Sequence, residues 1–263
     1  MALSDVAMVA ADSSRTRAYL YALARHDLLP AHVVVLENRT AELLPGQADD
    51  KVAAESEVAR GVVDEALAKA PPSAKDDCWS EVRFDMTRPL HGLLDALGVP
   101  WTAAPDKNIN APDVVAMIAA RPESVFIYSG YGGVLLRADV LSAGKRFLHV
   151  HGGYLPDFKG STTNYYSLLD EGQMGASAIF LTAEIDSGPI LSRRRFPAPE
   201  RRGEIDHVYD SAARAKVLVD TLAARAPTGD WRPELDNSAV GDTYYIIHPV
   251  LKHLAILGGG GDA

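Results

Sequence analysis

The feature that most constrains the fold is a regular alternation of short apolar runs with segments of helical periodicity. Residues 6–10 are an apolar run typical of a buried strand. The polar residues 12–14 follow and can cap a helix, whose apolar positions continue at helical spacing to Ala24. Residues 32–36 then form a second apolar run. This order predicts parallel strands joined by crossover helices.

The same alternation continues along the rest of the chain. Further strands are predicted at residues 81–85, 124–128, 146–150, 176–182 and 190–196. Further helices are predicted at residues 51–70, 90–97, 111–120, 138–142, 161–170 and 205–225. The predicted fold class is α/β: a Rossmann-like, mainly parallel sheet with helices on both faces. The last two strands follow each other without a helix, which favours a hairpin-like extension of that sheet.

Charge and cysteine content narrow the classes of partner. The 263 residues include 35 Asp and Glu against 26 Lys and Arg, a formal charge of -9. This balance argues against a nucleic acid partner, whose binding depends on neutralising phosphates. The only cysteine, Cys78, allows no intramolecular disulfide, which fits a reducing compartment, so we expect a cytoplasmic protein. We expect no membrane partner, because no apolar stretch approaches the roughly 20 residues that span a bilayer.

One predicted strand end carries two histidines, His149 and His151. In a strand, this spacing puts both rings on one face, near the carboxyl end where open α/β sheets place ligands. Gly152 and Gly153 follow, and we expect them to leave the rings accessible as the chain turns away. Asp186 lies in an Asp-Ser-Gly-Pro turn that can hold a carboxylate toward a neighbouring strand end. Such a histidine pair is more often structural, so the spacing alone is weak evidence of a site.

The wider stretch around these residues resembles the folate-dependent formyltransferase family, which includes glycinamide ribonucleotide transformylase, methionyl-tRNA formyltransferase and the sugar N-formyltransferases. In that family a strand ends in Asn-x-His-Pro-Ser-Leu-Leu-Pro, and an Asp-x-Gly-Pro-Ile type of turn follows later. The matching positions here are His151, Leu155, Pro156, Gly160 and the turn from Asp186 to Pro189. Residues 110–115 and 129–136 also resemble the segments that precede this strand in the family. The resemblance extends over about residues 108–191.

This resemblance implies transfer of a formyl group from 10-formyltetrahydrofolate to a primary amine of a small molecule. It implies catalytic positions for His149, His151 and Asp186. It also implies that two segments surround the formyl donor, namely Gly133, Val134 and Leu135 together with Thr182, Ala183, Glu184 and Ile185. Because charge develops on the formyl oxygen, a donor aimed at that oxygen lowers the barrier. We expect His151 to assist proton transfer, Asp186 to orient it and His149 to stabilise the oxyanion.

The sequence departs from the family pattern at position 149, where the usual Asn is a histidine. A neutral imidazole donates from only one nitrogen, and a neighbour must set its tautomer. Three hypotheses stay open for His149: an oxyanion donor, a role in a related acyl or one-carbon transfer, or a metal ligand with His151 and Asp186. The resemblance itself implies no metal. Two further hypotheses concern the whole protein: a binding protein that has lost formyl transfer, or a formyl-folate hydrolase.

The remaining expectations concern the acceptor and the domains. Residues 193–195 and 201–202 are arginine-rich and could meet an anionic acceptor, although a solvated strand edge is the commoner role. Residues 161–165 could touch the acceptor or cap a helix. We expect a catalytic domain at residues 1–197 and a helical extension and tail at 198–263. That extension is too short and too acidic for gripping RNA, which favours a small-molecule amine. A homodimer is left open.

Overall fold

A computed structural model describes residues 3–37, 84–237 and 241–258. Its strands are β1 (Leu3–Ala10), β2 (Pro30–Val35), β3 (Trp101–Ala103), β4 (Val125–Ser129), β5 (Arg146–His151), β6 (Phe158–Gly160), β7 (Gln173–Phe180), β8 (Ile190–Pro197) and β9 (Asp242–Tyr244). Its α-helices are α1 (Ser14–Arg25), α3 (Leu90–Leu97), α4 (Pro112–Ala119), α5 (Ala138–Leu141), α6 (Thr163–Asp170), α7 (Asp210–Arg225) and α8 (Pro249–Leu257). A 3-10 turn, η1 (Arg202–Glu204), and a π-helical turn, η2 (Ile205–Tyr209), precede α7.

Seven strands form one sheet in the order β3-β2-β1-β4-β5-β7-β8. The five strands from β3 to β5 are parallel, and β7 and β8 continue the sheet antiparallel. This confirms the predicted α/β class and the hairpin-like extension. β6 and β9 form a separate parallel pair that joins the loop after β5 to the end of the chain. The hairpin of β7 and β8 therefore forms one end of the mainly parallel sheet, next to β5, the strand that carries His149 and His151.

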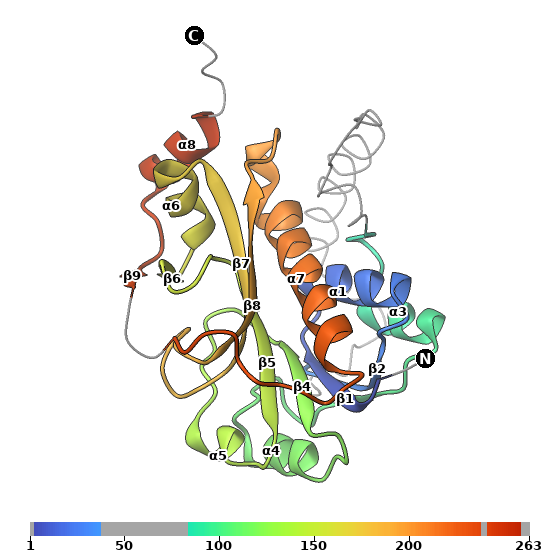
Figure 1. The fold of residues 1–263 in the computed structure, drawn as a ribbon. Helices are drawn as coiled ribbons and strands as arrows, with labels where there is room; N and C mark the ends of the chain where they lie inside the picture. The colour runs from blue at the N-terminus through green and yellow to red at the C-terminus, as the bar shows by residue number, and fades with distance from the viewer. Residues whose placement is uncertain (1–2, 38–83, 238–240, 259–263) are drawn as a thin grey trace.

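Helices cover both faces of the sheet, as predicted (Figure 1). α1, α3 and α7 contribute to one buried apolar cluster, and α4 and α5 contribute to another. Alternate residues of β1 point into the two clusters: Met8 and Ala10 into the first, Ala7 and Val9 into the second. A strand buried on both faces reads as a continuous apolar run, which is why residues 6–10 were recognisable in the sequence.

Several local predictions differ from the structure. Residues 84–85 are not in a strand, while residues 51–70 and 81–83 lie outside the described part of the chain. Helix α6 begins at Thr163, because Thr162 adopts a left-handed conformation (φ 51°) and neither Ser161 nor Thr162 caps the helix with its side chain. The helix predicted from residue 205 begins with the π-helical turn η2. The short strand β3 and the helix α8 were not predicted.

The region after residue 197 packs into the main core. The apolar face of α7 belongs to the same buried cluster as α1, and Trp231 and Ile247 also reach that cluster. A boundary between residues 197 and 198 therefore stays a prediction. In the segment at residues 244–248, Tyr245 and Ile246 are about four-fifths exposed (80% and 79%). Only Ile247 of that segment is buried.

Tyr19 of α1 carries a buried hydroxyl that has no hydrogen-bond partner among the described residues. Burial also raises the pKa of this hydroxyl to about 12. An unsatisfied buried hydroxyl costs roughly 1–3 kcal/mol, whereas the ring itself packs in the core. We expect Tyr19→Phe to raise the free energy of unfolding by about 1 kcal/mol, measured by urea denaturation. A lower stability in Tyr19→Phe would show that the hydroxyl has a partner in solution.

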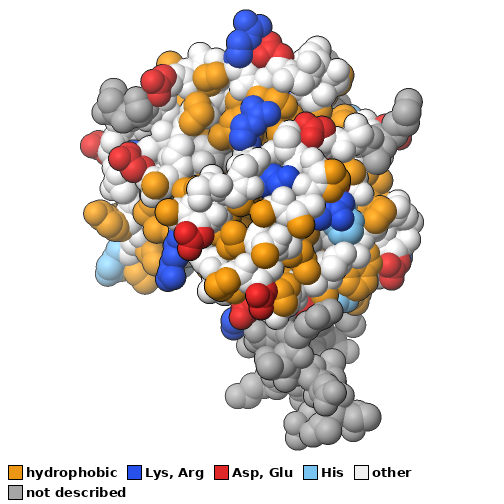
Figure 2. Space-filling model, turned by 90° about the horizontal axis from the view of Figure 1, so that it is seen from below, with side chains coloured by type: hydrophobic (Ala, Val, Ile, Leu, Met, Phe, Trp, Pro, Cys, Tyr) orange, Lys and Arg blue, Asp and Glu red, His pale blue; other side chains and the backbone are white. Residues whose placement is uncertain are grey.

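The charged side chains on the surface and the lengths of the helices concern two expectations, namely that neither a nucleic acid nor a membrane is a partner. On the face shown in Figure 2, Lys and Arg side chains are interspersed among acidic and apolar ones. In the described ranges, no helix is both long enough and apolar enough to cross a membrane. The expectation that the protein does not bind nucleic acid stays a prediction.

Candidate active site

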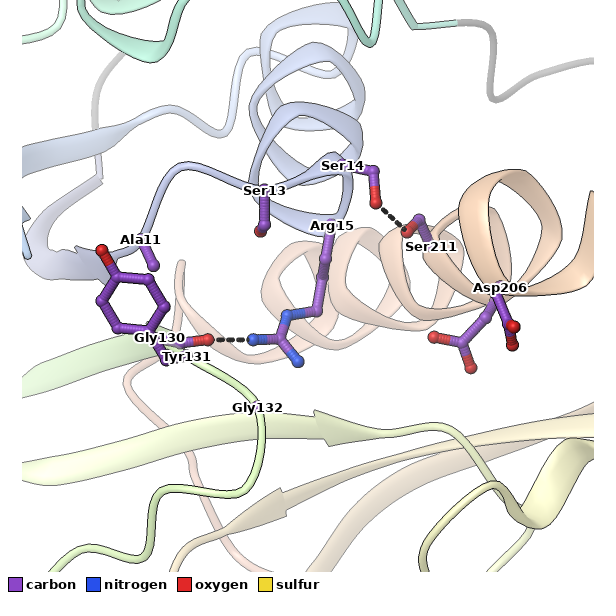
Figure 3. Close-up of a pocket in the computed structure, with 10 residues that line it drawn as sticks. Ala11, Ser13, Ser14, Arg15, Gly130, Tyr131, Gly132, Asp206 and Ser211 are labelled. Carbon is purple, nitrogen blue, oxygen red and sulfur yellow. Dashed lines mark hydrogen bonds between the residues drawn. The ribbon is translucent and has the colours of Figure 1, made fainter. Parts of the chain in front are cut away.

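The candidate site lies where the strand order reverses. The chain runs from β1 to β2 on one side of β1, and β4 lies on the other side. In open α/β sheets, ligands bind beyond the carboxyl ends of the strands at such a point. A cavity of about 240 Å³ lies there, lined by Ala11, Ser13, Ser14, Arg15, Gly130, Tyr131, Gly132, Asp206, Asp210 and Ser211 (Figure 3).

His151, the last residue of β5, forms a buried pair with Asp186 from the turn between β7 and β8. The distance from His151 Nδ1 to Asp186 Oδ2 is 3.3 Å, and His151 is only 4% exposed. The backbone N–H of Gly160 also donates to Asp186 Oδ2 at 3.1 Å. Burial alone would raise the pKa of Asp186, but His151 outweighs it and lowers this pKa to about 2. The expectation that the ring is accessible is wrong for His151, although its pairing with Asp186 matches the predicted geometry.

Both ring nitrogens of His151 face hydrogen-bond acceptors. Its Nε2 lies 2.9 Å from the carbonyl oxygen of Phe158, and its Nδ1 faces the Asp186 carboxylate. Thr163 lies 3.5 Å from the same Nε2, but its hydroxyl proton is donated to the carbonyl oxygen of Gly152. A carbonyl and an ionised carboxylate can only accept, so this arrangement is satisfied by a ring that carries a proton on both nitrogens. The Asp186 carboxylate and the Phe158 carbonyl oxygen therefore hold the ring from its two nitrogens.

Two glycines after His151 make room for the groups around it. A Cβ at Gly152 would overlap Asp210 Oδ1 and Arg214 Nη2. A Cβ at Gly153 would lie 2.5 Å from the Phe158 carbonyl oxygen and 2.7 Å from His151 Nε2. The Gly-Gly sequence in place of Pro-Ser is thus required by close packing of this loop, rather than by access to the rings.

Arg214 and Asp210 of α7 form the ion pair that packs on Gly152. Arg214 Nε donates to Asp210 Oδ2 at 2.7 Å, and Arg214 Nη1 donates to the carbonyl oxygen of Val150 at 2.6 Å. Asn164 donates to Asp210 Oδ1 at 3.0 Å. Helix α7 therefore holds the end of β5, although residues beyond 197 gave no diagnostic signal in the sequence.

His149 precedes His151 by two residues on β5. Its side chain lies on the same side of the sheet as that of Phe147, opposite Leu148 and Val150. Its Nδ1 is 3.4 Å from the carbonyl oxygen of Tyr128 on β4. Burial, together with Arg15 and Arg214, holds the pKa of His149 well below its usual value.

The metal hypothesis is not supported by the positions of these side chains. No group of three His, Cys, Asp or Glu residues is placed to hold a metal ion in the ranges that the structure describes.

The turn that carries Asp186 is fixed by close backbone contacts and by one buried amide. Asp186 has a positive φ of 49°, and a Cβ at Gly188 would overlap the carbonyl oxygen of Phe180. Asn237, which is buried, donates its side-chain N–H groups to the carbonyl oxygens of Asp186 (2.6 Å) and Gly188 (3.3 Å). Asn237 was not among the predicted site residues, because nothing local indicates that the tail returns to this turn.

One of the two segments expected around the formyl donor, and the residue directly before the other, lie on the face of the sheet covered by α4 and α5. Val134 and Leu181 both pack against the buried cluster of that face, and Leu181 N donates to the Phe147 carbonyl oxygen at 2.8 Å. Asn110 fixes the first segment by donating to the Leu135 carbonyl oxygen at 2.9 Å. Leu135 and Ile185 are 56% and 50% exposed, so each segment presents one large apolar side chain to solvent.

Arg15 is the cation of the cavity, and it was not among the predicted site residues. Its Nε lies 3.3 Å from Ser129 Oγ, and its Nη2 donates to the Gly130 carbonyl oxygen (Figure 3). Among the described residues, no carboxylate forms an ion pair with Arg15, whereas Asp210 is paired with Arg214 and Asp206 with Lys252. A polar run directly after the first strand is the sequence signal that could have identified this residue.

The arginines at residues 193–195 do not line this cavity. They lie on β8, the edge strand, where Arg195 pairs with Asp157 and Glu171 and stacks over the Tyr154 ring. Arg194 pairs with Asp220. Their contacts agree with the commoner role of such residues at a strand edge.

Comparison with known proteins identifies the class to which this fold and site belong. The formyl transferase family model matches residues 84–219, about half of the chain. The chain therefore belongs to the formyl transferase family.

Individual relatives are distant. The methionyl-tRNA formyltransferases of Roseiflexus sp. and Rhodopirellula baltica are 30% and 27% identical over 148 and 154 residues, which cover 55% and 54% of this chain. The chain spans less than half of their length (44% and 45%).

Solved structures share the fold. Glycinamide ribonucleotide transformylase 1 from Symbiobacterium toebii superposes with a TM-score of 0.53 at 18% identity, over 91% of this chain and 95% of that one. A sugar N-formyltransferase from Shewanella sp. FDAARGOS_354 gives 0.50 at 16% identity, over 98% and 89%.

Proposed function

We propose that this formyl transferase family member transfers the formyl group of 10-formyltetrahydrofolate to a primary amine of a small molecule. The observation that carries this proposal is the buried His151–Asp186 pair at the carboxyl end of β5, at the positions where the family motif has its histidine and aspartate. The pair lies next to the cavity, since Gly152 packs against Asp210, which lines it.

The residues beside β5 fit a flat, partly apolar donor. Leu135 and Ile185 offer exposed apolar side chains on the two segments expected to surround it. Val134 in the first segment and Leu181 directly before the second pack against the buried cluster that contains Phe147, two residues before His149. We infer that the folate lies against this face and directs its formyl group toward His149 and His151.

The cavity suits an acceptor that carries a negative charge as well as an amine. Arg15 is a partly buried cation without an ion-pair partner in the described residues, and an anionic group would satisfy it. Ser13, Ser14 and Ser211 add hydroxyl groups to the same cavity. We infer that the anionic part of the acceptor binds Arg15 while its amine approaches the formyl carbon.

The chemistry follows from the charges at the site. The amine nitrogen attacks the formyl carbon, and the carbonyl electron pair moves to oxygen. A His151 ring protonated on both nitrogens would favour this charged state, and Asp186 orients the ring. Because these charges are fixed in a buried site before the reaction, little reorganisation is needed as the oxyanion forms.

The test is to incubate the full chain with 10-formyltetrahydrofolate and a panel of primary amines, with and without phosphate or carboxylate groups. We expect mass spectrometry to detect a formylated amine, formed preferentially from an anionic member of the panel. His151→Ala should make no such product while it stays folded.

Two outcomes would contradict the proposal. Release of formate at a rate independent of every amine would indicate a formyl-folate hydrolase. Absence of binding to a folate analogue would indicate a protein that has lost the donor site.

A further inference from the structure

The hydrogen bond of His149 determines which of its ring nitrogens is free. Tyr128 on β4 is beside His149 on β5, because Ile127 pairs with Leu148 in the parallel register. The carbonyl oxygen of Tyr128 can only accept, so the proton of a neutral His149 lies on Nδ1, 3.4 Å away. The Nε2 of a neutral ring then carries a lone pair and no proton.

The charges around His149 keep the ring neutral. Arg15 from α1, Arg214 from α7 and His151 from the same strand all disfavour a second proton, and burial acts in the same direction. Only Asp186 favours the charged ring, and it is already engaged by His151. The Tyr128 ring also lies beside the His149 ring at a tilt, with ring centroids 6.0 Å apart, but brings no charge. The surroundings of His149 therefore favour its neutral form.

We propose that His149 is a catalytic proton acceptor, whose Nε2 receives the proton that the attacking amine loses. This inference rests on the proposed formyl transfer. This role differs from hydrogen-bond donation to the oxyanion. Such donation needs a proton on the nitrogen that faces the substrate, whereas a proton acceptor needs a lone pair there. The asparagine that the family usually carries at this position can donate a hydrogen bond but cannot take up a proton.

The proton and electron balance of the step is complete. The amine nitrogen forms a bond to the formyl carbon, the carbonyl pair moves to oxygen, and the nitrogen becomes cationic and acidic. Its proton moves to His149 Nε2. The oxygen pair then re-forms the carbonyl, the bond from the formyl carbon to the folate nitrogen breaks, and His149 returns the proton to that nitrogen. A weakly basic group can serve here, as carboxylates do in other enzymes, because the donor becomes acidic only when the bond forms.

The tautomer can be measured without a substrate. In nitrogen NMR of the full chain with ¹⁵N-labelled histidine, the His149 signals are assigned by their loss in His149→Gln. We expect a protonated Nδ1 and a bare Nε2 from about pH 5 to 8, because the pKa of this ring is lowered. A proton on Nε2, or a doubly protonated ring in this range, would overturn the inference.

Kinetics then test the catalytic role with an amine that the wild type formylates. Gln at position 149 keeps a side-chain N–H donor and lacks a basic nitrogen. We expect His149→Gln to lower kcat/KM by about 10²- to 10⁴-fold with folate-analogue binding retained. His253→Gln, on the exposed side of α8, is the matched control and should match the wild type.

The outcomes separate this inference from the proposed function. Wild-type turnover in His149→Gln would refute the proton acceptor and leave formyl transfer standing. A wild-type protein that formylates no amine would refute both.

Discussion

Replacing Asp186 with Asn is expected to reduce formyl transfer by about 10²- to 10⁴-fold, the range typical of a lost proton-handling group. The carboxylate lies 3.3 Å from His151 Nδ1 and orients the ring. Asn keeps the size of the side chain and an acceptor for Gly160 N–H, but its neutral amide removes the negative charge that faces the ring. The rate is measured as kcat/KM with an amine formylated by the wild type. Equal turnover in Asp186→Asn would remove the pair from the mechanism.

The same substitution has a stability signature that depends on pH. The folded pKa of Asp186 is about 2, below its ordinary value of 3.8. The unfolded chain therefore binds the proton more readily, so this carboxylate stabilises the fold above about pH 4 by roughly 2 kcal/mol. That contribution is lost as the pH falls from about 4 to about 2. Asp186→Asn should accordingly be less stable than the wild type at neutral pH, and the difference should shrink across this window.

Gly188→Ala is expected to have the largest effect on stability. A methyl group at this position would overlap the main-chain carbonyl oxygen of Phe180, which belongs to β7 and cannot rotate away. The turn must shift, at a cost of about 3 kcal/mol. Because Asp186 is two residues away and Asn237 binds both carbonyl groups of the turn, the shift also moves the carboxylate relative to His151. Thermal unfolding and kcat should both fall.

A second glycine provides the control for that substitution. Gly203 lies in η1 with no heavy atom within 4 Å of a Cβ built on it. Gly203→Ala should change the free energy of unfolding by less than about 0.5 kcal/mol. If Gly188→Ala were as harmless as Gly203→Ala, the turn would be mobile enough to accommodate a side chain, and its geometry would not position Asp186.

The residues that depart from the family pattern lie close together in the structure. His149 replaces an asparagine, and Gly152 and Gly153 replace a proline and a serine. The first change places a neutral ring between Tyr128 and two arginines, and the glycines admit the Arg214–Asp210 pair and the hydrogen bonds of His151. A single substitution toward the family sequence therefore disturbs its neighbours, and the site is best tested by changes that keep side-chain size.

The sequence by itself determined the α/β class, most of the strands and helices, and the likeness to formyltransferases around residues 108–191. Strands buried on both faces and helices ended by glycine or begun by proline leave patterns within a few residues, so residues 6–10, 90–97 and 111–120 could be assigned locally. His151 and Asp186 were recognisable because they stand in a motif.

Only the tertiary structure decided how those residues work together. The cavity brings the start of α1 next to the loop after β4 and the start of α7, segments nearly 200 residues apart in sequence, as Ser14 and Ser211 show. The surroundings of the two histidines come from five other segments, through Tyr128, Phe158, Asp186, Arg15 and Arg214. Local spacing carries no record of such contacts, because hydrogen bonding and electrostatic shifts depend on distances that exist only after the sheet has formed.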